Sequence, residues 1–101
     1  MTAAAIESAG AKWAQKIYDE KLAKKDFVNL GAGFSDELCA ARSVAAIAHR
    51  KLYLPGIAAG TRVINPELPK HQRVFWTDVI KHASQLCIEA EQMIEKQFNN
   101  K

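Results

Sequence analysis

The chain has 101 residues, of which 49% are apolar and 25% are charged, and its formal net charge is +3. This length predicts one domain, because most domains hold about 100–200 residues, and the charged fraction is typical of globular rather than disordered or collagen-like proteins. The sequence contains no run of about 18 uncharged apolar residues, which excludes a membrane span. We therefore expect residues 1–101 to form a single soluble helical domain.

The first predicted helix covers residues 3–25, where apolar residues such as Ile6 and Trp13 recur at three- and four-residue steps. That spacing is typical of an amphipathic helix. Thr2 is a candidate N-cap. Gly10 lies inside the helix, at a cost of about 0.5–1 kcal/mol relative to alanine. A glycine at this point predicts a close crossing with a neighbouring helix.

The second predicted helix covers residues 36–53 and begins after Ser35, the expected N-cap. Asp36 and Glu37 follow in the first turn, where the helix dipole favours acidic side chains. Alanine is frequent along the rest of this segment, so neighbouring helices can approach it closely. We expect this helix to be the central one.

Residues 55–69 connect the second and third helices and contain all three prolines of the chain. Connections between packed helices usually take about 2–8 residues, so this one is longer than packing requires. Arg62–Ile64 could be extended within it. We expect a long irregular loop, the part of the chain that helix packing explains least.

The third predicted helix covers residues 70–98 and has the most regular apolar spacing. Its apolar arc is wide, which suits contact with two neighbouring helices or with a second copy of the chain. The candidate self-association strip, spaced at seven residues, is Ile80, Cys87 and Ile94. Coverage of this strip by the first two helices is the alternative.

Together these elements predict an all-α fold: a small antiparallel bundle of three principal helices, with a long irregular loop between the second and the third. Trp13 and Trp76 are the expected core anchors. Phe75 lies about 100° from Trp76 around the helix axis. We therefore expect one of these two neighbours to contact the long loop or a partner chain.

Positive charge is concentrated in residues 42–82, which hold seven cations and two acids. The candidates for binding a partner or an anion are Arg50, Lys51, Arg62, Lys70, His71 and Arg73. The last three begin a helix, where each cation opposes the dipole at a cost of about 0.3–1 kcal/mol. A bound anion would compensate for them. The alternative is an internal partner, with Asp36 or Glu37 pairing to Arg73.

Other candidate sites are interpreted as structural. His71, Asp78 and His82 are expected to share a solvent-facing stripe of the third helix. Asp78 and His82 are one turn apart and could hold a metal ion, but a metal site needs three or four converging ligands. An exposed ion pair between them is therefore the preferred interpretation.

Cys39 and Cys87 lie in apolar, helix-like stretches, where a free cysteine behaves as a small buried hydrophobe. The sequence leaves a disulfide between them open but does not require one. The N-terminus lacks the basic-then-apolar order of a secretory signal, so a cytoplasmic location is expected. A reactive thiol would need an electropositive, half-exposed site, and Arg42 is the only notable cation nearby.

These observations predict a non-enzymatic helical interaction or accessory protein, without cofactor, metal site or catalytic residues. We expect it to form a homodimer or other homo-oligomer through its third helix and to present its basic end to an acidic protein surface. The alternative is a nucleic-acid-binding module that uses region 42–82, although seven cations are few for that role.

Overall fold

The computed structural model describes residues 8–99, which form three helices and one two-stranded antiparallel sheet. In chain order the elements are α1 (Ala9–Lys24), α2 (Asp36–Leu52), β1 (Tyr53–Pro55), β2 (Arg62–Ile64) and α3 (Lys70–Asn99). The mostly helical fold predicted from the sequence is confirmed, with a small sheet in addition. Thr2 and residues 3–7 of the first predicted helix lie outside the described residues.

Serine side chains set the beginnings of α1 and α2. The Ser8 hydroxyl accepts the Ala11 N–H at 3.1 Å, and the Ser35 hydroxyl accepts the Leu38 N–H at 3.2 Å. Each bond satisfies one of the N–H groups that a helix leaves unpaired in its first turn. Ser35 is the N-cap that the sequence predicts.

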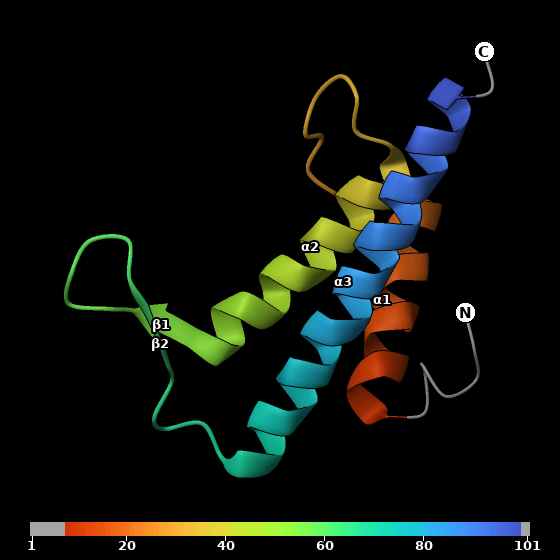
Figure 1. The fold of residues 1–101 in the computed structure, drawn as a ribbon. Helices are drawn as coiled ribbons and strands as arrows, with labels where there is room; N and C mark the ends of the chain where they lie inside the picture. The colour runs from red at the N-terminus through yellow and green to blue at the C-terminus, as the bar shows by residue number, and fades with distance from the viewer. Residues whose placement is uncertain (1–7, 100–101) are drawn as a thin grey trace.

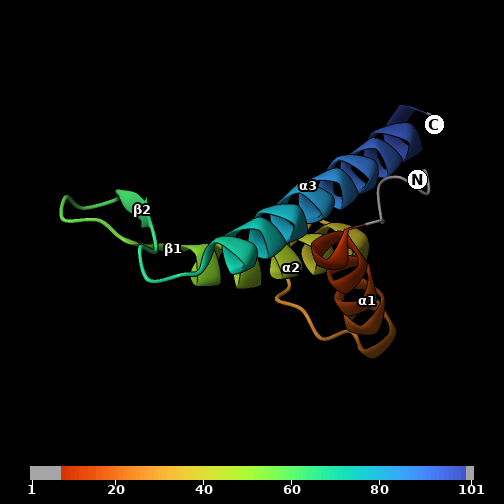
Figure 2. The same ribbon diagram turned by 90° about the horizontal axis from the view of Figure 1, so that it is seen from below.

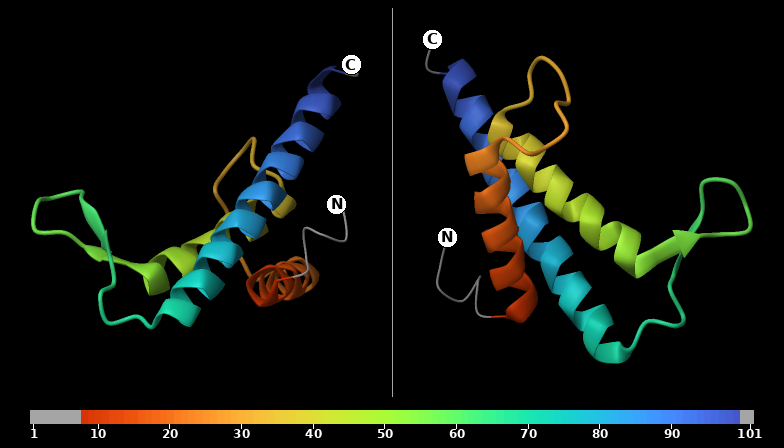
Figure 3. Two further views of the ribbon diagram at one scale, coloured as in Figure 1. Left: turned by 60° about the horizontal axis from the view of Figure 1, so that its bottom comes forward. Right: turned by 180° about the vertical axis from the view of Figure 1, so that it is seen from behind.

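The longest helix, α3, carries the other two on one side (Figures 1 and 2). In Figure 1, α2 runs in the opposite general direction to α1 and α3. Figure 3 shows that α2 and α3 move apart toward the C-terminal end of α2, so the two helices form a V. The opposite side of α3 is not covered by the other two helices.

The core is small and is centred on alanine and valine. Its fully buried centre consists of Ala14, Val44, Ala48, Val79 and Ala83. Because these side chains are short, the helix backbones can approach one another closely. The central helix is α3, which packs against both α1 and α2, and not α2 as its alanine content led us to expect.

Gly10 lies at a close approach between α1 and α3. A Cβ atom on Gly10 would collide with the Phe75 carbonyl oxygen and would lie 2.8 Å from the Asp78 Cβ and 3.1 Å from the Val79 nitrogen. These are backbone atoms or the root of a side chain, so they cannot rotate away. The close helix crossing predicted at Gly10 is confirmed.

Three half-buried aromatic side chains join α1 to α3. The Trp13 ring centroid lies 5.3 Å from that of Trp76 and 6.0 Å from that of Phe75, and all three pairs meet edge-on. Such pairs contribute about 0.5–1.5 kcal/mol beyond their buried area. Trp13 is large enough to contact both Phe75 and Trp76, and contact of either ring with a partner chain stays a prediction.

A β-hairpin occupies most of the connection between α2 and α3, which is therefore not the irregular loop that we expected. Leu54 lies opposite Val63 in its register, and the Gly56 N–H donates to the Thr61 carbonyl at 2.8 Å. Gly60 has a φ of 82°, a left-handed conformation that glycine adopts without strain. The expected extended backbone of β2 is confirmed. The hairpin projects away from the helices (Figure 1).

Candidate functional site

The six cationic candidates are exposed and lie on consecutive elements at one end of the molecule. They occupy the last turn of α2, the first residue of β2 and the first turns of α3. Figures 1 and 3 show these three parts of the chain on the same side of the fold. We use the term basic end for this set: Arg50, Lys51, Arg62, Lys70, His71 and Arg73.

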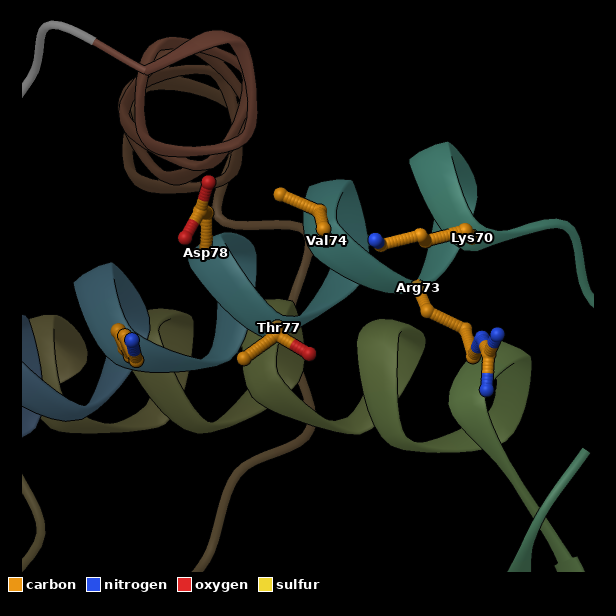
Figure 4. Close-up of a pocket in the computed structure, with 6 residues that line it drawn as sticks. Lys70, Arg73, Val74, Thr77 and Asp78 are labelled. Atoms are coloured by element: carbon orange, nitrogen blue, oxygen red, sulfur yellow. The ribbon is translucent and has the colours of Figure 1, made fainter.

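A surface groove follows the first turns of α3 (Figure 4). It is lined by Lys70, Arg73, Val74, Thr77, Asp78 and Lys81. The groove has a net positive charge, because its lining contains three cations and one carboxylate. Val74 adds an exposed apolar surface. In Figure 4 the Arg73 guanidinium points to the side of α3 on which α2 lies, and the Asp78 carboxylate points toward α1. This lining suits a partner that carries acidic groups beside apolar ones.

The internal partner considered for Arg73 does not form. Asp36 and Glu37 begin α2 at the end of the molecule away from the start of α3 (Figure 1). Within residues 8–99, Arg73 makes no ion pair with either of them. The unfavourable position of cations at the start of α3 is therefore not offset by these two acids.

The hairpin exposes apolar side chains on both of its faces. Leu54 is 40% exposed, Val63 and Ile64 are 50% exposed, and Ile57 in the turn is fully exposed. Because Leu54 and Val63 are register partners, their side chains share one face, while Ile64 and Tyr53 share the other. An isolated two-stranded hairpin is only marginally stable in water, and clustered exposed apolar side chains are typical of interaction sites.

The candidate self-association strip on α3 is partly covered. Ile80, Cys87 and Ile94 are half-buried, and Ile80 packs against the core. The large apolar side chains of α3 that are most exposed are others: Val74, Ile88, Met93 and Phe98. Sequence periodicity could not distinguish these two sets, because the apolar arc of α3 is wide.

His82 and Asp78 do not lie on the solvent-facing stripe of α3 where we expected them. His82 is only 4% exposed, and its Nε2 lies 2.8 Å from the Gln15 Oε1 on α1. Asp78 is half-buried, with its Cβ close to Gly10 at the start of α1, where the helix dipole favours an acid. Only His71 of the three stays exposed. The polar contact between His82 and Gln15 was missed, and no signal in the sequence pairs these residues.

Both cysteines are free thiols in environments that oppose reactivity. Cys39 is buried, and burial raises the pKa of the Cys87 thiol although the Arg42 charge acts in the opposite direction. The thiolate is the nucleophilic form, so we expect both thiols to react slowly with a thiol reagent at neutral pH and promptly after unfolding. Rapid labelling of the native protein, counted by mass spectrometry, would contradict this prediction.

The chemistry of the described chain offers few other candidate sites. Among residues 8–99, no three side chains of His, Cys, Asp or Glu are placed to hold a metal ion. In the same range, none of the helices combines the length and apolar content of a membrane span. Comparisons with models of known protein families, with curated proteins and with solved structures found no match to this chain.

Proposed function

We propose that this protein is a non-enzymatic interaction protein that uses its basic end and the adjoining hairpin to bind an acidic surface of a partner protein. The observation that carries the proposal is the hairpin, an apolar ribbon that extends from the helical body between two cationic helix ends. Between Arg50 and Arg73, Glu67 is the only acidic residue. Apolar contact and positive charge are therefore available on the same surface.

The aromatic residues of this region favour a protein partner over a nucleic acid. Single-stranded nucleic acids bind where exposed aromatic rings stack on bases within a basic groove. Phe75 and Trp76 instead pack against Trp13, and Tyr53 stacks on His49 with a centroid distance of 5.5 Å. The hairpin itself carries a single cation, Arg62. Nucleic-acid binding through region 42–82 is kept as the competing outcome of the test.

Affinity capture from a nuclease-treated lysate of the native cells tests the proposal. The bait is the full chain, compared with a variant that carries both R62E and R73E. We expect an acidic protein that the wild-type chain retains and the variant loses. A short DNA duplex is titrated in parallel: tight binding that weakens by about 0.9 log unit per phosphate contact for each log unit of salt would replace the proposal with the nucleic-acid alternative.

Single alanine substitutions separate binding from stability. Arg62→Ala and Arg73→Ala remove exposed cations that form no ion pair within the described chain. We expect each to weaken capture of the partner while leaving the melting temperature nearly unchanged, because exposed charges contribute only about 0–1 kcal/mol to stability. Lys16→Ala, an exposed cation of α1, is the matched control. Loss of several kcal/mol with unchanged capture would indicate a structural role instead.

Self-association through α3 is the second part of the proposal. Contact through Ile80, Cys87 and Ile94 predicts a sedimentation mass of about twice 11.2 kDa at tens of micromolar protein. We expect Ile94→Lys to produce a monomer that keeps its helical circular dichroism, and Gln97→Lys, a charge added at an exposed position, to leave the dimer intact. A wild-type monomer at this concentration would contradict the prediction.

A further inference from the structure

Hydrogen bonds at the two ends of the hairpin determine which of its backbone groups point outward. The Asn65 N–H donates to the Leu52 carbonyl and the Gly56 N–H donates to the Thr61 carbonyl, each over 2.8 Å. These two bonds bracket the three residue pairs of the sheet. Bonded and non-bonded pairs alternate in an antiparallel ladder. Only the middle pair, Leu54 and Val63, is therefore hydrogen-bonded between the two strands. In the outer two pairs, the backbone N–H and carbonyl groups point away from the opposite strand.

This alternation makes the two edges of the hairpin unequal. On β2, Arg62 and Ile64 each direct an N–H and a carbonyl outward. On β1, Pro55 has no N–H, and the Tyr53 N–H already donates to the His49 carbonyl. The edge of β1 thus offers no donor, whereas within the described chain the edge of β2 is open to a further strand. Proline on one edge is a common protection against strand pairing.

From this asymmetry we propose that β2 receives a third strand, contributed by an extended segment of the partner protein in which apolar and acidic residues alternate. The inference rests on the proposed function and specifies how the partner binds. Strand addition gains its affinity from main-chain hydrogen bonds and its specificity from alternate side chains. It would also turn a marginal two-stranded hairpin into a three-stranded sheet.

The side chains of the hairpin determine where the added strand is expected to have apolar residues and where it is expected to have acidic ones. Val63 and Leu54 form an apolar row on one face, so residues of the added strand on that face are expected to be apolar. Arg62 lies on the opposite face together with Ile64, and an acidic residue of the added strand opposite Arg62 would lie beside its guanidinium. Successive residues of a strand point to opposite faces. The partner segment is therefore expected to have a period of two.

Charge argues against a second copy of this chain as the third strand. Pairing of β2 with β2 of a second chain would bring two basic ends together. Near β2, each basic end has one acid, Glu67, and four cations: Arg50, Lys51, Arg62 and Lys70. Like charges brought together in this way repel each other. An acidic segment meets the same surface with complementary charge.

The test uses the full chain and three end-capped, fluorescent octapeptides. The first alternates valine and glutamate, the second has the same composition with its valines and glutamates in separate blocks, and the third alternates valine and lysine. We expect the alternating acidic peptide to bind at least tenfold more tightly than the other two. We also expect it to slow hydrogen exchange of the Arg62 and Ile64 amides at least tenfold in the wild-type protein, an observation that needs no variant.

A matched pair of variants isolates the outward N–H group. Both substitutions remove the isoleucine side chain. Ile64→Pro also removes the backbone N–H, which Ile64→Ala retains. We expect the proline variant to bind the alternating acidic peptide at least tenfold more weakly than the alanine variant, with the helical circular dichroism of both unchanged. Because the exchange measurement is made on the wild-type protein, it decides the question even where the proline variant loses its hairpin.

Several results would overturn the inference. Peptide binding with unprotected amides and equal affinities of the two variants would exclude strand addition, while the proposed function would stand on partner capture alone. Absence of peptide binding at millimolar concentration would also exclude it. Protection of the same two amides by a DNA duplex but not by the peptide would replace it with the nucleic-acid alternative, and the capture experiment would then fail as well.

Discussion

Gly10→Ala is expected to destabilise the protein by about 1–3 kcal/mol, the usual effect of overpacking a close contact. Helix propensity alone predicts the opposite sign, since alanine in a helix interior is favoured over glycine by about 0.5–1 kcal/mol. The structure decides between them, because the new methyl group would meet the Phe75 carbonyl, the Asp78 Cβ and the Val79 nitrogen. To accommodate it, α1 has to move away from α3, and the contacts of Trp13 would loosen with it.

Urea unfolding monitored by circular dichroism measures the change in the free energy of unfolding. Ala23→Gly, at an exposed position of the same helix, is the control. It is expected to cost up to about 1 kcal/mol through propensity alone. A gain of stability in Gly10→Ala would mean that α1 and α3 are farther apart in solution than the structure places them.

Sequence periodicity was sufficient for α2 and α3 because each of them buries one face. The spacing of apolar residues located both helices to within one residue at each end, and Ser35 marked the beginning of α2. The beginning of α1 at Ala9, after the Ser8 cap, was not predicted. Gly10 was also informative, because a glycine inside a helix has an energetic cost that only a close contact explains. These signals are local, and the sequence contains them directly.

The hairpin was only partly predictable. Val63 and Ile64 are β-branched and favour extended backbone, so the strand character of β2 could be seen in the sequence. Tyr53 and Leu54 instead follow a helical segment without interruption before Pro55, and we placed the helix end after Tyr53. The pairing of β1 with β2 depends on the turn at residues 56–61, whose hydrogen bonds have no clear counterpart in the sequence pattern.

The basic end illustrates the limit of reasoning from charge along the chain. The clustering of cations follows from chain order, because the end of one helix, its connection and the start of the next are neighbours. The internal pairing of Arg73 with Asp36 or Glu37 was also considered, and the structure does not contain it. Since α2 runs opposite to α3, its first residues lie at the other end of the molecule.

The polar contact between α1 and α3 depends on tertiary structure that periodicity does not encode. His82 flanks the apolar stripe of α3, a position that is exposed on an isolated amphipathic helix. Here α1 crosses over it, and Gln15 supplies a polar atom at hydrogen-bond distance. Burial of a polar side chain is tolerated when it finds such a partner.

His82→Ala is therefore expected to reduce the free energy of unfolding by about 2–4 kcal/mol. This loss has two causes: the substitution leaves a cavity, and the Gln15 side chain loses its polar contact with His82. Gln85→Ala, at an exposed polar position of α3, is the control and is expected to change stability by less than about 0.5 kcal/mol. Gln15→Ala and the double variant complete a double-mutant cycle, whose coupling energy is expected to be about 0.5–1.5 kcal/mol. Additive effects would show that His82 and Gln15 do not interact in solution. A loss as small as that of Gln85→Ala would place His82 on the solvent face of α3, as its position beside the apolar stripe first indicated.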